Sequence, residues 1–84
     1  MVRFSLAKAL FDRGDFAEAI PHFRAALEKR ADWMVVTILL GRCQLALGDK
    51  VAARESFERA RQLAIEQHHE GPLAELDQLL SELN

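Results

Sequence analysis

Cysteine is almost absent from the sequence: Cys43 stands alone, so no disulfide can form within the chain and packing has to hold the fold. Long hydrophobic runs are missing too. The longest, WMVVTILLG at residues 33–41, is shorter than the about 20 residues that a membrane-spanning helix needs. The first residues, MVRFSLAKALF, lack the uninterrupted apolar stretch and the cleavage site of a signal peptide. These absences, with a cysteine usage that suits a reducing compartment, predict a soluble, cytoplasmic protein without a membrane partner.

Basic residues are missing from the last part of the chain. All eleven Lys and Arg lie at or before Arg61 together with eight acidic residues, so this part carries a formal charge of +3 (11 − 8). Five acidic residues and no basic one follow Arg61, so the end of the chain carries −5. A charge of +3 with both signs mixed is not the clustered basic face that nucleic acid requires. We therefore expect no nucleic-acid partner.

Strand-like alternation is absent as well. Apolar residues recur at intervals of three and four, which predicts an all-α protein in one small domain, residues 1–84. Five helices are expected, at about 2–13, 16–30, 33–47, 50–70 and 72–83. One face of the first is assigned to Val2, Leu6, Ala9, Leu10 and Arg13.

The helix boundaries are assigned from glycine, aspartate and proline. The Gly-Asp pairs at 14–15 and 48–49 each predict a tight turn, in which glycine ends one helix and aspartate caps the next. Asp32 is expected to cap the third helix. Gly71 is expected to end the fourth helix and Pro72 to begin the last one.

The sequence contains an internal repeat. GDFAEAIPHFRAAL at residues 14–27 recurs 34 positions later (48 − 14) as GDKVAARESFERAR at residues 48–61. The identical pairs are Gly14/Gly48, Asp15/Asp49, Ala19/Ala53, Phe23/Phe57 and Ala26/Ala60, preceded by Val2/Val36 and Leu6/Leu40.

The period and these residues resemble the tetratricopeptide repeat family, in which each repeat of 34 residues is a helical hairpin. The resemblance implies two antiparallel hairpins and a C-terminal capping helix in an α-α superhelix. Repeat 1 covers about 1–31, repeat 2 about 33–69 and the capping helix about 72–83. Ala7 and Gly41, small residues of the first helices, are expected to let backbones approach closely. The departures from the family pattern are Arg3 and Thr37 in place of an aromatic residue, Ala31 and Ile65 in place of a closing proline, and Gln44 in place of an apolar residue.

The sequence contains no recognisable catalytic or metal-binding motif. Cys43 lies in an apolar segment and is expected to be buried and unreactive. His68 and His69 are adjacent, so on a helix they point about 100° apart and cannot share a metal ion unaided. Trp33 is assigned to packing between the hairpins. We therefore expect no enzyme activity, no cofactor and no metal.

The resemblance implies a binding surface, because in this family the first helices of successive hairpins line a concave face that receives a peptide. Lys8 and Arg42 are 34 positions apart, so stacking would place two cations side by side. With apolar neighbours, such a face suits a peptide carrying a carboxylate, either an acidic motif or a free C-terminus. The equal alternative is that these charges only keep the face hydrated. The residues assigned to the face are Phe4, Lys8, Phe11, Asp12, Ile38, Arg42 and Leu45.

The function implied is a protein–protein interaction module, an adaptor that binds a peptide segment on this concave face. The family's clamp for chaperone C-termini needs Lys and Asn where this chain has Phe4 and Lys8, so that ligand is not supported. The alternative is a self-assembling scaffold piece, or a fragment of a longer array without its own ligand.

The chain is not expected to work as an isolated monomer, on two grounds. Two repeats are fewer than the about three that stable arrays usually need, and Val2, Phe4 and Phe11 are expected to leave an apolar patch. A homodimer or a bound partner would cover this patch, and the homodimer is slightly favoured. The acidic last helix is expected to dock on the surface around Lys8 and Arg42, in its own chain or in a neighbour.

Overall fold

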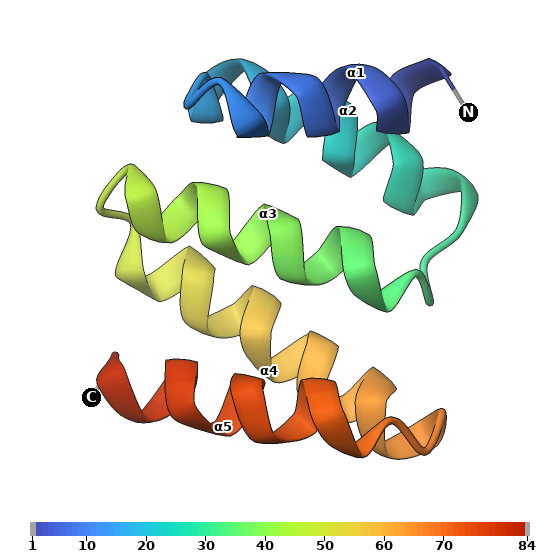
Figure 1. Cartoon of the computed structure of the whole chain (residues 1–84), viewed down its shortest axis with the longest axis vertical. Coiled ribbons are helices and arrows are strands. Elements are labelled where there is room, and N and C mark those ends of the chain that lie inside the picture. The colour runs from blue at the N-terminus through green and yellow to red at the C-terminus, as the bar shows by residue number, and fades with distance from the viewer. Residues whose placement is uncertain (1, 84) are drawn as a thin grey trace.

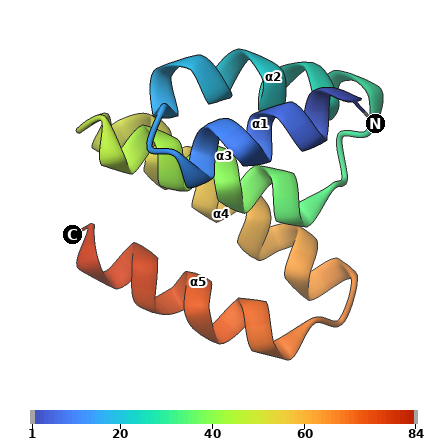
Figure 2. The same cartoon turned by 45° about the horizontal axis from the view of Figure 1, so that its top comes forward.

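Five helices make up the regular structure of the part of the chain that the computed structural model describes, residues 2–83, with side chains from Phe4 to Leu83. They are α1 (Val2–Asp12), α2 (Phe16–Lys29), α3 (Met34–Ala46), α4 (Lys50–Glu66) and α5 (Glu70–Glu82). Successive helices run antiparallel, so α1, α3 and α5 point one way and α2 and α4 the other (Figure 1). α3 and α4 lie between the pair α1–α2 and the single helix α5 (Figure 2). The predicted all-α fold is confirmed.

Each hairpin turns at one of the predicted Gly-Asp pairs. Gly14 and Gly48 have φ of 84° and 86°, a left-handed conformation that costs glycine little because it has no Cβ. In both turns the N–H groups of glycine and aspartate donate to carbonyls of the preceding helix, at 2.8–3.0 Å. These bonds satisfy carbonyls that the helix end leaves without partners.

The two aspartates of these turns behave differently. The carboxylate of Asp49 accepts a hydrogen bond from the N–H of Ala52 at 3.2 Å, as predicted for a helix cap. The carboxylate of Asp15 makes no cap bond and lies 3.3 Å from Nη2 of Arg13. The capping prediction is therefore confirmed at Asp49 and wrong at Asp15, because a neighbouring arginine attracts that carboxylate.

The predicted start of α3 is also wrong. The residue that precedes the helix is Trp33, whose side chain makes no cap bond. The carboxylate of Asp32 lies 3.8 Å from Nε of Arg30 instead.

The break between α4 and α5 falls earlier than expected. α4 ends at Glu66, and His68 takes a left-handed conformation with φ of 58°. Gly71 and Pro72 both lie in the first turn of α5, where a proline is tolerated because its missing N–H would have no helical partner. The prediction that Gly71 ends α4 is therefore wrong.

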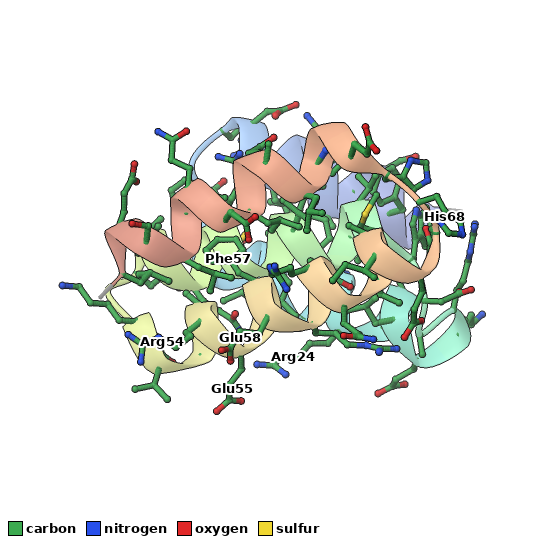
Figure 3. All side chains as sticks on the ribbon, turned by 90° about the horizontal axis from the view of Figure 1, so that it is seen from below. Arg24, Arg54, Glu55, Phe57, Glu58 and His68 are labelled. Atoms are coloured by element: carbon green, nitrogen blue, oxygen red, sulfur yellow. The ribbon has the colours of Figure 1, made fainter. Side chains whose placement is uncertain are left out.

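Two apolar clusters form the core, and α3 contributes to both. One lies between α1, α2 and α3 around Phe23. The other lies between α3, α4 and α5 around Phe57, which is labelled in Figure 3. Both rings are fully buried. A Cβ added to Gly41 would lie only 2.6 Å from the ring of Phe57, and the equivalent Ala7 is fully buried. Both positions are therefore too crowded for a larger side chain, and the close approach of backbones there stays a prediction.

The apolar face of α1 differs from the expected one. Ala7 and Leu10 are buried, whereas Ala9 is exposed and Leu6 is 44% exposed. α1 packs on α2 and α3, and no other described helix contacts it. Leu40, at the same repeat position as Leu6, is only 6% exposed because it belongs to the cluster that α2 covers. The side chain of Val2 lies outside the described residues.

Candidate functional site

The seven residues assigned to the binding face lie on two helices that contact each other. Phe4, Lys8, Phe11 and Asp12 are on α1, and Ile38, Arg42 and Leu45 are on α3. Each of the seven side chains is half-buried or exposed. The stripe Phe4, Lys8 and Phe11 has the i, i+4, i+7 spacing of one helix face, so these three side chains point to the same side of α1.

Lys8 forms a compact unit with its neighbours one turn along α1. Its Nζ donates to both carboxylate oxygens of Asp12, at 2.8 and 3.0 Å. The same Nζ lies 5.9 Å from the ring centroid of Phe11, within the range of a cation–π contact. Lys8 and Asp12 remain about half exposed, so water and other molecules can reach both.

Phe4 and Phe11 do not leave the open apolar patch that the sequence predicts. Phe4 stacks on Trp33 with 4.8 Å between ring centroids, and Phe11 packs edge-on against Phe16 at 5.5 Å. The expectation of an exposed patch at these two rings is therefore wrong in part: both rings are half-buried. Among the side chains of α1 that the structure describes, the exposed large apolar one is Leu6.

Trp33 packs against the first apolar cluster, as the sequence predicts, and it also contacts a residue of the candidate face. It is half-buried, stacks on Phe4, and carries the guanidinium of Arg30 5.2 Å from its ring centroid. The sequence signal was available, because a lone tryptophan at the junction of two hairpins has an apolar body that serves both packing and contact.

The acidic helix α5 approaches the α3 part of the face. Arg42 donates to the carboxylate of Glu75 on α5. Ile38 and Leu45 pack against the second apolar cluster, as do three half-buried leucines of α5 and Leu83, the residue that follows this helix. The expected docking of the acidic segment thus occurs within the chain at Arg42, whereas Lys8 pairs with Asp12 instead.

Two further cations that sequence reasoning did not single out also hold α5. Nε of Arg61 on α4 donates to the carboxylate of Asp77 at 2.6 Å. Nη2 of Arg54 on α4 donates to the backbone carbonyl of Leu83 at 3.0 Å. The sequence did contain a signal for these two contacts: the residues up to Arg61 carry a net positive charge and the residues after it a net negative one.

The side chains considered for catalysis or metal binding, Cys43, His68 and His69, lie apart from the candidate face. Cys43 is fully buried, and this burial raises the pKa of its thiol to about 11, which opposes formation of the nucleophilic thiolate. His68 lies in the turn after α4, and His69 is the residue that precedes α5. Over the described residues, no group of three His, Cys, Asp or Glu side chains is placed to hold a metal ion. None of the described helices is both long and apolar enough to cross a membrane.

The family model described as tetratricopeptide repeat matches residues 4–68. The chain belongs to the tetratricopeptide repeat family. The recognition made from the 34-residue period is confirmed, and membership indicates a protein-interaction or scaffold module.

Two relatives of this tetratricopeptide repeat chain illustrate the similarity. A TPR repeat-containing protein of Pseudomonas aeruginosa is 32% identical over 59 residues, which cover 70% of this chain and 56% of that protein. The chain therefore spans little more than half the length of this curated relative. The solution structure of a protein from Bordetella parapertussis superimposes with a TM-score of 0.87 at 31% identity, covering 96% of this chain and 70% of that one.

Proposed function

We propose that this tetratricopeptide repeat chain is an adaptor that binds an acidic peptide segment on the face formed by α1 and α3. The observation that carries the proposal is the position of Lys8, a half-exposed cation between two aromatic side chains, Phe4 and Phe11, on one face of α1. A peptide carboxylate and a neighbouring apolar side chain can contact this stripe together.

The hydrogen bonds of Lys8 leave room for a ligand. Its ammonium group has three N–H donors, and the bonds described for it go to the two oxygens of Asp12. An incoming carboxylate can take the remaining donor or replace Asp12. Replacement is cheap, because an exposed pair such as this contributes only about 0.2–1 kcal/mol.

Aromatic surface supplies the apolar part of the contact. Phe4 and Trp33 form one half-buried stack, and Phe11 forms a second aromatic pair one helical turn beyond Lys8. On α3, Arg42 keeps 39% of its side chain exposed beside Glu75 and adds positive charge to the same face. Asp12, Ile38 and Leu45 complete the assigned set.

The test separates binding from simple hydration of the face. Fluorescent peptides selected on the wild-type chain from a random library are expected to be acidic. Lys8→Glu should weaken their binding at least tenfold in fluorescence anisotropy, because it puts a negative charge where a carboxylate binds. Lys29→Glu on α2 makes the same change of net charge at an exposed lysine away from this face, and it should leave affinity within about twofold.

Circular dichroism should show the same helix content for both variants. Selection of basic peptides, or equal binding by the Lys8→Glu and Lys29→Glu variants, would show that the face does not bind carboxylates. Lys8 is chosen because it does not contact α5, so the result does not depend on how that helix is held.

A scaffold role is the second candidate, and the exposure of Leu6 favours it. Leu40 is covered by the helices of the first hairpin, whereas the corresponding side of α1 has no helix over it among the described residues. Stacking of another helical hairpin there would bury Leu6. Sedimentation at several concentrations should then show association that Leu6→Glu abolishes, and a concentration-independent monomer would eliminate this role.

A further inference from the structure

The two cations of the candidate face have different kinds of partner. Lys8 pairs with Asp12 inside α1, whereas Arg42 of α3 pairs with Glu75, a residue of α5 that was not assigned to the face. Glu75 follows Arg42 by 33 positions, so this pair forms because the last helix packs back on the rest of the chain. The carboxylate of Glu75 therefore lies where a ligand carboxylate would have to bind Arg42.

The pair of Arg42 and Glu75 is accessible to a ligand. The two side chains are 39% and 50% exposed, and an exposed ion pair contributes only about 0.2–1 kcal/mol. The hydrogen bond described between them uses Nη2 of Arg42, and a guanidinium carries five N–H donors. A second carboxylate can therefore approach this guanidinium and exchange with that of Glu75 at little cost.

α5 has other contacts that hold it in place when Glu75 leaves Arg42. Leu76 is buried completely and belongs to the second apolar cluster. Asp77 accepts a hydrogen bond from Nε of Arg61 on α4, at 2.6 Å. The side chain of Glu75 can therefore turn away while the helix stays on α3 and α4.

The distance between the two cations sets the kind of ligand that can reach both. α1 and α3 contact each other and run in the same direction (Figure 1), and Lys8 and Arg42 occupy the same position in successive repeats. Packed helices have axes about 8–10 Å apart. In a polyproline II peptide, which has three residues per turn and rises about 3.1 Å per residue, residues three positions apart point to the same side and lie about 9 Å apart. Two acidic residues at this spacing match the two cations.

We propose that Glu75 is an internal competitor that masks Arg42, and that an extended peptide with two acidic residues three positions apart displaces it. The inference rests on the proposed peptide binding at Lys8 and adds a second contact of the same ligand. The first acidic residue binds Lys8, and the second takes the guanidinium of Arg42 from Glu75. The occupant is a carboxylate because the chain already places one of its own at this cation. Glu75 lowers the affinity for such peptides, since they must replace an existing ion pair to form a new one.

The test compares two peptides of identical composition, acetylated and amidated at their ends. Phe-Glu-Pro-Pro-Glu has the proposed spacing, and Phe-Glu-Pro-Glu-Pro places the second glutamate one position too early. Their charges are equal, and the prolines favour the polyproline II conformation in both. Titration into the isotope-labelled chain, followed by NMR, gives the affinity and the location of binding together. Glu75→Gln should raise the affinity of the first peptide about 2- to 5-fold, the effect of one exposed ion pair, and that of the second by less than about 1.5-fold.

Asp77→Asn is the matched control, because it removes the same charge from the same helix at a pair with Arg61, which was not assigned to the face. It should change the affinity of either peptide by less than about 1.5-fold. Adding Arg42→Gln to Glu75→Gln should abolish the gain. Circular dichroism should show the helix content of wild type for all these variants.

The location of the NMR shifts separates this inference from the proposed function. Both peptides should shift signals of α1 around Lys8, and only the first should also shift signals around Arg42 and Glu75. Shifts confined to α1, or a gain in Glu75→Gln that the second peptide or Asp77→Asn shares, would overturn the masking and leave the peptide binding intact. Unchanged signals in α1 would refute the peptide binding itself, and this inference with it.

Discussion

Replacing Gly41 by alanine is expected to destabilise the fold although alanine is the better helix former. A Cβ at this position of α3 would lie 2.6 Å from Cε1 and 2.8 Å from Cδ1 of Phe57. Carbon atoms in contact normally lie about 3.5–4.0 Å apart. Phe57 is fully buried, so its ring cannot move aside without displacing its neighbours.

Two terms of opposite sign decide the magnitude for Gly41→Ala. Helix propensity favours alanine over glycine by about 0.8–1.0 kcal/mol in a helix interior. Overpacking a filled core costs about 1–3 kcal/mol. The overlap is about 0.9 Å (3.5 − 2.6) against an aromatic ring, which places the cost at the upper end. The net expectation is a loss of about 2 kcal/mol in the free energy of unfolding.

Gly71→Ala is the matched control, because it makes the same substitution in a helix without the clash. Gly71 lies in the first turn of α5, and a Cβ there would meet nothing within 4 Å. Propensity alone should act, with a gain of up to about 1 kcal/mol. A change of 1 kcal/mol moves the melting temperature of a domain of this size by about 4–8 °C. Thermal melts should therefore show a fall of about 8–16 °C for Gly41→Ala and a small rise for Gly71→Ala.

Phe57→Leu identifies the ring as the cause. This substitution removes the ring atoms nearest to position 41, so Gly41→Ala should cost much less in that background than in wild type. The double-mutant cycle measures the difference as a coupling energy. The reasoning fails if Gly41→Ala is as stable as Gly71→Ala, or if its cost is unchanged when the ring is absent.

Three smaller predictions can be checked by unfolding the variants in urea. Asp49→Ala removes a helix cap and should cost about 0.5–2 kcal/mol, whereas Asp15→Ala removes no cap bond and should cost less than half as much; equal losses would contradict the assignment. Burial raises the pKa of the Cys43 thiol to about 11, above an ordinary value of about 8.5. The stabilisation of the fold by the neutral thiol is therefore complete below about pH 8.5 and is lost as the pH rises toward 11, on the order of 3 kcal/mol in the free energy of unfolding; Cys43→Ala should not show this loss. Leu40→Ala should cost about 2–5 kcal/mol and Leu6→Ala, at the same repeat position but exposed, under about 1 kcal/mol; similar losses would mean that Leu6 is covered in solution.

The helical hairpins could be predicted from the sequence, because the interactions that define them are local. Gly14 and Gly48 end their helices through bonds to carbonyls of the preceding turn. The 34-residue interval places Phe23 and Phe57 at the same point of successive hairpins, and both are fully buried. A pattern that recurs within one turn or one hairpin can be read before the arrangement of the whole chain is known.

The Gly-Asp sequence of the two turns was not sufficient to predict whether the aspartate caps the following helix. Gly-Asp occurs in both turns, yet Asp49 caps a helix and Asp15 does not. The residue before each glycine differs: Arg13 in the first turn and Leu47 in the second. Arg13 attracts the carboxylate of Asp15, and Leu47 has no charge with which to do so. The competing partner is visible in the sequence, but the geometry that favours it is not.

The surroundings of Gln44 were decided by tertiary structure alone. From the sequence it was an unexplained polar residue at an apolar position, and it is buried. Its amide lies 2.6 Å from the hydroxyl of Ser56 on α4. With the amide nitrogen donating to Ser56, its oxygen accepts from Nη2 of Arg24 on α2 at 3.3 Å. Three helices thus meet at one amide, and no spacing along the chain predicts that meeting.

The seven residues assigned to the candidate face lie on α1 and α3, and the side-chain partners of its two cations could be predicted only in part. Lys8 pairs with Asp12, which lies one helical turn away, and a spacing of four residues allows this pair. Arg42 pairs with Glu75, 33 positions later, because α5 packs on α4 and α4 packs on α3. Local bonds and helix periodicity depend on neighbours in sequence, so they can be predicted from it. Which charges pair and which leucines are covered depends on how the helices stack, so only the tertiary structure could show them.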